Sequence, residues 1–309
     1  MRLAICHGEN LTTIPVMITS TESGIGACTG TKDSPVSMVD IRSVFPDHEV
    51  APIRSLRAIL PELCDPERRA RLERMFRESE SIEQIRSTFR PGPPVSDPPK
   101  ILCVGLNYRD HAQECGQTVP DRPVWFNKLP TSLCGPDDPV RIPPVVQFAD
   151  YEAELVVVIG RGGRNIPISE AMSYVAGYTC GNDVTARDWQ FGRPGGQWFA
   201  GKTFDTFAPI GPVLVTPDEL DPTRLSIECR VNGERRQDSS TSQFIFPIDF
   251  LIHEISQVCT LEPGDLIWTG TPPGIGYART PPVPLRMGDI VEIEIGGIGV
   301  LRNPVCAPA

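Results

Sequence analysis

The chain has 309 residues, of which 40% are hydrophobic and 22% charged, and its formal net charge is −10. This length allows a large core and two domains. The acidic balance argues against a nucleic-acid or anionic-membrane partner, and no run of about 18 apolar residues is present to span a bilayer. The ten cysteines form no C-x-x-C pair. The N-terminus lacks a signal-peptide core, and Glu9 and Glu22 come too early for a typical transit peptide. We therefore expect reduced thiols in a cytoplasmic protein.

Residues 1–97 are predicted to form a smaller N-terminal domain. Two apolar runs and one mixed-charge region indicate two strands and a helical segment, at residues 3–6, 14–18 and 53–88. The run Arg90-Pro-Gly-Pro-Pro-Val-Ser-Asp-Pro-Pro99 has the composition of a linker. The domain boundary is therefore predicted at this run, with residues 98–309 as the second domain.

A histidine and a glutamate follow the first strand of this second domain, which is predicted at residues 101–105. If Asn107 or Asp110 caps a short helix, His111 and Glu114 are i and i+3 on one helical face. A carboxylate beside an imidazole orients its tautomer and raises its basicity, as a general base requires. On spacing alone a surface His–Glu pair is the commoner outcome, so both interpretations stay open.

Two carboxylates stand where a strand enters the interior. A period of two places Glu152 and Glu154 on one face, and residues 155–159 are apolar on both faces. Like charges about 4 Å apart repel by about 4 kcal/mol at an effective dielectric of about 20. The pair therefore needs a proton, flanking cations or a metal. Glu292 and Glu294 have the same spacing but alternate with apolar residues, which is typical of a half-exposed strand with its charges in water.

A third carboxylate is predicted to lie nearby. A short helix is expected from Ser169 through Ala176, closed by Gly177. The strand that follows it ends at Asp183, one strand–helix–strand unit after Glu154. Three carboxylates with open positions suit a hard cation with oxygen ligands, namely Mg²⁺, Mn²⁺ or Ca²⁺.

The segment Gly196-Gln-Trp-Phe-Ala-Gly-Lys-Thr203 matches the phosphate-loop pattern G-x-x-x-x-G-K-T. A phosphate loop needs a buried strand before it and a helix after it, whereas glycine and proline flank this segment on both sides. A nucleotide-binding protein is therefore only a rival interpretation. Lys202 is then a candidate for holding an anionic substrate or intermediate. Lys128 stands among apolar and turn residues.

The C-terminal part is dominated by predicted strands. Residues 226–231 alternate into Asn232-Gly233, a strong hairpin turn, and residues 248–259 have an apolar helical face. Thr271 would offer a hydroxyl at the mouth of a strand, and two further strands are predicted at residues 289–295 and 298–301. Many strands, few helices and no repeated βα units predict an α+β, β-rich fold.

Five motifs, in this order, resemble those of the fumarylacetoacetate hydrolase family over about residues 100–305. They are Gly105-x-Asn-Tyr-x-x-His111-x-x-Glu114, Tyr-Glu152-Ala-Glu154-Leu, Asn-Asp183-Val-Thr-Ala-Arg-Asp-x-Gln190, Gly-Lys202-x-Phe-Asp and Gly-Thr271-Pro-Pro-Gly. The resemblance implies a rolled mixed β-sheet catalytic domain and a homodimer. Residues 1–97 contain no comparable motif.

The resemblance also implies roles for individual residues. Glu152, Glu154 and Asp183 would hold Mg²⁺ or a similar ion, and His111 and Glu114 would be a water-activating dyad on a mobile lid. The remaining candidates would act at the substrate: Lys202 as a catalytic residue, and Gln190, Thr271, Arg187 and Lys128 in binding.

The expected activity is metal-dependent hydrolysis of a C–C bond in a 2,4-dioxo acid of the acylpyruvate or fumarylpyruvate type. The resemblance implies a 2-oxo acid chelated so that the metal stabilises an enolate. Relatives that decarboxylate or isomerise 2-oxo or 2-hydroxy-dienoic acids would share this site, so those reactions are the alternative. A non-catalytic metal-stabilised module is a further rival, but it assigns no role to His111 and Glu114.

Overall fold

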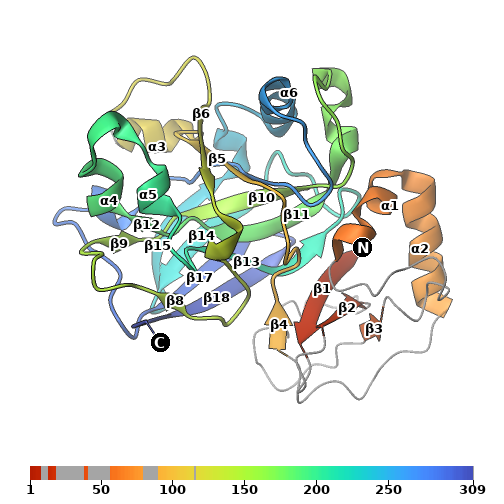
Figure 1. Ribbon diagram of the computed structural model, residues 1–309, viewed down its shortest axis with the longest axis horizontal. Helices are drawn as coiled ribbons and strands as arrows, with labels where there is room; N and C mark the ends of the chain where they lie inside the picture. Colours follow the sequence, from red (N-terminus) through yellow and green to blue (C-terminus); the bar gives the residue numbers. More distant parts are fainter. Residues whose placement is uncertain (8–12, 19–37, 41–55, 79–89, 115, 309) are drawn as a thin grey trace.

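The computed structural model describes residues 1–7, 13–18, 38–40, 56–78, 90–114 and 116–308 (Figure 1). Strands dominate, and they form two principal sheets with helices around them. This confirms the predicted β-rich α+β class. Within the described ranges, no helix is long and apolar enough to cross a membrane.

The larger sheet has eleven strands, nine of them in the order β3-β2-β1-β13-β11-β10-β16-β5-β6, with β4 paired to β1 and β7 to β13. Most neighbours are antiparallel, but β16 and β5, like β13 and β7, run parallel. Its strands are β1 (Arg2–His7), β2 (Thr13–Ile18), β3 (Met38–Asp40), β4 (Arg90–Gly92), β5 (Ile101–Gly105), β6 (Val124–Lys128), β7 (Leu133–Cys134), β10 (Ala153–Ile159), β11 (Val175–Asn182), β13 (Ala208–Val215) and β16 (Leu266–Trp268).

The second sheet has five strands in the order β15-β14-β17-β18-β8. Their bounds are β8 (Val140–Arg141), β14 (Ser226–Val231), β15 (Glu234–Ser240), β17 (Ile290–Ile295) and β18 (Gly299–Cys306), and a separate pair joins β9 (Ala149–Asp150) to β12 (Thr185–Ala186). The predicted hairpin is present between β14 and β15. Asn232 and Gly233 make the turn with φ of 54° and 78°, the left-handed region that these residues tolerate.

Strand β10 lies between two apolar layers, which explains its unbroken apolar run. Leu155, Val157 and Ile159 pack in the core shared with β14, β17 and β18. Val156 and Val158 pack on the opposite face with residues of helix α1 (Leu60–Cys64). Each such side chain contributes about 1.5–3 kcal/mol on burial, so the position of β10 in the sheet is strongly fixed.

The helices are short, and one expected helical region is divided. Within residues 53–88, the described part consists of a 3₁₀ turn, α1 and α2 (Pro66–Glu78). Pro66 cannot continue α1, and Asp65 accepts hydrogen bonds from the N–H groups of Glu67 and Arg68, which starts α2. The remaining helices are α3 (Arg109–Glu114), α4 (Arg187–Phe191), α5 (Phe199–Lys202) and α6 (Ile248–Val258), the last within one residue of its prediction.

The helix predicted to end at Gly177 was wrong. A 3₁₀ helix covers Ile168–Tyr174, and β11 has already begun at Val175. A Cβ at position 177 would lie 2.5 Å from the carbonyl oxygen of Val215 in β13. The glycine therefore permits close strand contact rather than closing a helix.

The N-terminal segment is connected to the large sheet. β1 pairs with β13, and β4 from the proline-rich run pairs with β1. Figure 1 shows β1, α1 and α2 gathered at one edge of the molecule. The proline-rich run is therefore partly a strand, while the domain boundary and the homodimer stay predictions.

Candidate active site

The antiparallel pairing of β10 and β11 brings the three acidic candidates together. Ala153 is the register partner of Asn182, which places Glu152 opposite Asp183. The N–H of Asp183 donates to the carbonyl oxygen of Glu152 at 2.9 Å, and the Asn182 side chain accepts from the N–H of Glu152 at 3.0 Å. One carboxylate oxygen from each of Glu152, Glu154 and Asp183 lies within 4.8 Å of the others, and all three residues are buried.

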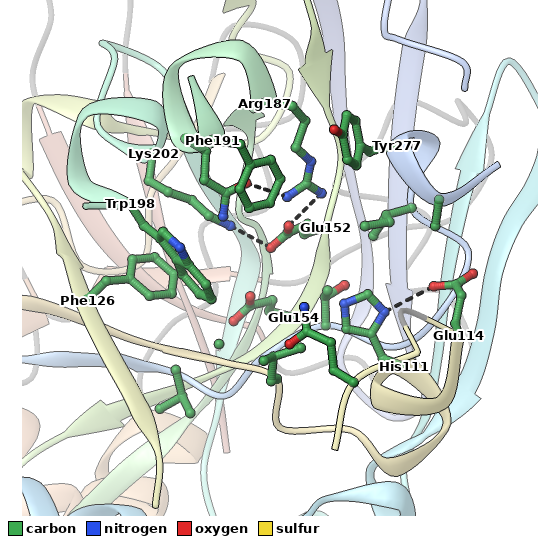
Figure 2. A pocket seen from close by; sticks show the side chains of 18 residues that line it. His111, Glu114, Phe126, Glu152, Glu154, Arg187, Phe191, Trp198, Lys202 and Tyr277 are labelled. Atoms are coloured by element: carbon green, nitrogen blue, oxygen red, sulfur yellow. Dashed lines mark hydrogen bonds and ion pairs between the residues drawn. The ribbon is translucent and has the colours of Figure 1, made fainter. Parts of the chain in front are cut away.

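Three buried cations flank these carboxylates. The Lys202 ammonium bridges Glu152 and Asp183, with both Nζ–O distances 2.7 Å. Arg187 contacts Glu152 at 2.7 Å and Asp150 at 2.9 Å, and Figure 2 shows Arg187 and Lys202 converging on Glu152. Lys128 binds Asp183 and also donates to the carbonyl oxygen of Val184 at 3.1 Å.

Within the described residues, no Lys or Arg side chain forms an ion pair with Glu154. Among the described residues, its hydrogen-bond donor is the backbone N–H of Gly270, at 2.8 Å. Burial, together with the negative charges of Asp183 and Glu152, raises the pKa of the Glu154 carboxyl well above its ordinary value. With Asp150 included, the cluster has four carboxyl groups and three cations, so it is one positive charge short when all four carboxyl groups are ionised.

Glu152 and Lys202 remain ionised in the same cluster. Although burial opposes the charge on Glu152, the Lys202 ammonium and the Arg187 guanidinium lower the pKa of Glu152 to about 2. Burial likewise opposes the charge on Lys202, but Asp183 and Glu152 raise the pKa of the ammonium above its ordinary value. Of the two glutamates, Glu154 is therefore the one whose surroundings favour the protonated form.

The residues fit a divalent cation. The donor set consists entirely of carboxylate oxygens, which hard cations such as Mg²⁺ and Mn²⁺ prefer. Glu154 is the carboxyl group without a cationic partner within the described residues, so a cation would supply the missing charge. This arrangement supports a divalent metal site without fixing which metal it holds.

The histidine–glutamate pair lies on α3. His111 Nδ1 is 3.0 Å from Glu114 Oε2, and His111 is only 6% exposed. Glu114 Oε1 accepts from the N–H of Gly274 at 2.9 Å, and Asp110 accepts from the Ser239 hydroxyl at 2.6 Å. Helix α3 is thus attached to the loop after β16 and to β15, and the pair is not a free surface pair.

A cavity of about 320 Å³ contains most of the candidates. Of the candidates drawn from the sequence, all but Lys128 and Asp183 line it: His111, Glu114, Glu152, Glu154, Arg187, Gln190, Lys202 and Thr271. Lys128 is 2% exposed and lies behind Asp183, away from the lining. Figure 2 shows Trp198 and Phe126 on one side of Glu154 and the His111–Glu114 pair on the other.

The phosphate-loop match has no phosphate-loop structure. Pro194–Gly196 is a 3₁₀ turn, and α5 that follows has only four residues and ends at Lys202. No buried strand leads directly into the segment, since α4 and the turn precede it. Lys202 is instead directed into the carboxylate cluster, which removes the basis of the nucleotide-binding interpretation.

Two buried residues at the site had no role in the sequence analysis. Asp150 accepts from Arg187, from Gly276 and from Tyr277, and so orients the guanidinium. The period of two predicts that Asp150 shares a strand face with Glu152 and Glu154, but that pattern assigned it no function. Gln237 lies in the polar strand Glu-Arg-Arg-Gln-Asp-Ser-Ser, where nothing distinguishes it from solvated neighbours.

Comparisons with known proteins identify relatives of this chain. The family model described as fumarylacetoacetate hydrolase, C-terminal, matches residues 100–306. A mitochondrial oxaloacetate tautomerase of Xenopus laevis is 52% identical over 213 residues, covering 69% of this chain and 67% of the relative. Two solved structures cover the whole of both chains at 33% identity. They are a fumarylacetoacetate hydrolase of Exiguobacterium antarcticum, with a TM-score of 0.77, and a 5-carboxymethyl-2-hydroxymuconate delta-isomerase of Mycobacterium smegmatis, with a TM-score of 0.74.

The expected cytoplasmic location was wrong by the same comparison, because the name of the Xenopus relative places that protein in mitochondria. A cytoplasmic location was expected from reduced cysteines and from Glu9 and Glu22, which are atypical of a transit peptide. Seven described cysteines are free. Free thiols do not separate one reducing compartment from another.

Proposed function

Because the chain belongs to the fumarylacetoacetate hydrolase family, we propose that it is a metal-dependent enzyme that interconverts the keto and enol forms of a 2-oxo dicarboxylic acid such as oxaloacetate. The observation that carries the proposal is the His111–Glu114 pair facing the buried carboxylates inside one cavity. One of the three relatives is named a hydrolase, but the 52% identical one is named a tautomerase and the third an isomerase, which favours this reaction over the expected C–C hydrolysis.

The base in this proposal is His111. Tautomerisation removes a proton from the carbon beside the keto group and places a proton on the keto oxygen. Glu114, at 3.0 Å from Nδ1, fixes the tautomer in which Nδ1 carries hydrogen, so that Nε2 is the basic nitrogen. Gly274 holds the other carboxylate oxygen, which keeps the imidazole oriented towards the cavity.

The side of the cavity that faces His111 would bind the 2-oxo acid and stabilise its negative charge. Lys202 lines the cavity and keeps its positive charge beside Glu152 and Asp183. Gln190 and Thr271 provide neutral hydrogen-bonding groups. Glu152, Glu154 and Asp183 would hold Mg²⁺ or Mn²⁺, which would act as a Lewis acid on the keto oxygen.

Burial makes these interactions effective. The carboxylates, Lys202 and Arg187 are each at most 6% exposed, and in a site with little water charge–charge interactions are stronger than in bulk solvent. The aromatic rings of Phe126, Trp198, Phe191 and Tyr277 form much of the remaining wall.

The direct test measures three reactions on one preparation. Oxaloacetate enol–keto conversion is followed by ultraviolet absorbance, carbon dioxide release reports decarboxylation, and pyruvate release from acylpyruvates reports hydrolysis. We expect the first activity to dominate, to disappear with EDTA, and to return with Mg²⁺ or Mn²⁺. If acylpyruvate cleavage is faster, the proposed tautomerase activity is wrong and the protein is a hydrolase. Full activity in the metal-free protein would refute the proposed metal site.

A further inference from the structure

A buried glutamine links strand β10 to the loop that carries Thr271. Gln237 lies in β15 and is 1% exposed. Its Oε1 accepts from the backbone N–H of Ala153 at 2.9 Å. Its Nε2 donates to the carbonyl oxygen of Pro272 and to the Thr271 hydroxyl oxygen, at 2.8 Å each.

The two backbone partners determine which way the side-chain amide points. The N–H of Ala153 can only donate, and the carbonyl of Pro272 can only accept, so exchanging Oε1 and Nε2 would break both hydrogen bonds. Nε2 must therefore also be the donor to Thr271. The Thr271 oxygen accepts this bond, and its own hydrogen is directed elsewhere.

The Thr271 hydroxyl hydrogen has no protein acceptor within the described part of the chain. Thr271 is 4% exposed and lines the cavity. A hydroxyl whose oxygen is already used as an acceptor is available there as a donor, and a donor stabilises an anion more strongly than a neutral group.

Building on the proposed function, we propose that Gln237 is a positioning residue that makes Thr271 a hydrogen-bond donor to a negatively charged oxygen of the 2-oxo acid. The ligand class is therefore an oxyanion, either a carboxylate or an enolate oxygen. Gln237 itself does not line the cavity and acts through Thr271.

The same side chain is one of the links that hold the Thr271 loop beside the carboxylates. β16 pairs with β10 at Val156–Val158, and Thr269 and Gly270 extend this contact to Leu155 and Glu154. The Ala153 N–H has the Gln237 side chain as its partner. Ala153 stands between Glu152 and Glu154, so Gln237 connects the acidic strand directly to the Thr271 loop.

A double-mutant cycle tests this relay. Thr271→Val removes the hydroxyl and keeps the shape, and Gln237→Met removes the amide at similar length. We expect each to lower kcat for oxaloacetate, and to weaken oxalate binding in the presence of Mn²⁺, on the order of 10- to 100-fold. The double variant should be no worse than the worse single variant, because both changes remove one interaction. Losses that multiply would show that Gln237 acts independently of Thr271 and would overturn the relay.

Further variants separate the relay from folding. Asn303→Leu is the matched control, since Asn303 is also 1% exposed and its amide donates to two backbone carbonyls in a different part of the fold. It should lower the unfolding temperature without changing kcat. Thr271→Ser keeps the hydroxyl, so this variant should retain activity when Gln237 is unchanged. If Gln237→Met does not fold, Gln237→Glu replaces it. A carboxylate would draw the Thr271 hydrogen towards itself, so wild-type oxalate affinity in Gln237→Glu would refute the relay.

The two proposals fail in different ways. If the wild-type protein does not act on oxaloacetate, the tautomerase proposal fails, and the oxalate titrations of the same variants still test the relay. If the wild type is active and Thr271→Val is fully active, the relay alone is refuted.

Discussion

Glu154→Gln is expected to abolish a proton release that accompanies metal binding to the wild-type protein. The carboxylate oxygens of Glu152, Glu154 and Asp183 lie within 4.8 Å of one another. At that separation and an effective dielectric of about 20, each like-charge pair costs about 3.5 kcal/mol. Lys202 bridges Glu152 and Asp183 and offsets their charges, so the repulsion acts mainly on Glu154. Burial and the neighbouring negative charges raise the pKa of the Glu154 carboxyl.

Because the surroundings of Glu154 favour its protonated form, we expect a divalent cation to displace a proton from this carboxyl group. Below the raised pKa, we expect release of about one proton per metal and a dissociation constant that falls about tenfold per pH unit. Isothermal titration calorimetry with Mn²⁺, in two buffers of different ionisation enthalpy, measures the protons released. Glu154→Gln should bind metal more weakly and release none.

The metal-free protein offers a second measurement. Because the folded state holds a proton on Glu154 that the unfolded chain has lost, its stability should fall as pH rises from the unfolded carboxyl pKa to the raised one. Glu152 has the opposite sign, since its pKa of about 2 means that its contribution is lost only as pH falls below the unfolded value. Glu154→Gln should remove the first trend and leave the second.

The matched control is Glu294→Gln. Glu294 is half-exposed on β17 and accepts from Arg230 at 2.7 Å, outside the cavity. It should leave both the proton release and the pH trend unchanged. Metal binding to the wild type without proton release would show that Glu154 is already ionised, and the electrostatic argument would fail.

The remaining predictions concern the base, a buried lysine and a wall of the cavity. His111→Ala and Glu114→Gln should each lower kcat by about 10²–10⁴-fold without changing Mn²⁺ affinity. Kinetics of the double variant should show no further loss, because the pair acts as one unit. If the losses multiply, the two residues act independently. Lys128→Met removes one of the two cations that contact Asp183 and should destabilise the fold by about 1.5–3 kcal/mol in denaturant titrations; an unchanged midpoint would refute this. Gly105→Ala would place a Cβ 2.1 Å from the Trp198 ring, which lines the cavity and would have to move. KM should therefore rise and tryptophan fluorescence should change. Unchanged values would show that Trp198 does not hold this position.

Local features of the structure could be predicted because their causes are local. The apolar run of β10 follows from burial on both faces, and the Asn232-Gly233 turn follows from the left-handed conformation that those residues tolerate. The acidic candidates could be chosen for the same reason, since a period of two assigns Glu152 and Glu154 to one face.

Tertiary structure decided which chemically similar residues share the site. Lys128 and Lys202 both stand in apolar surroundings in the sequence, but Lys202 lines the cavity and Lys128 lies behind Asp183. The glycine at 177 had the pattern of a helix end, yet the approach of β13 explains it.

Gln237 is the clearest case of a site residue that the sequence alone did not identify. The sequence by itself determined the types of residue that could hold a metal and move a proton, because charge and periodicity belong to each segment. It did not determine that a glutamine in a polar strand would be buried between Ala153 and Thr271. That contact joins two strands and a loop that are distant in the chain, and only their packing in three dimensions brings the hydrogen-bonding groups within reach of one another.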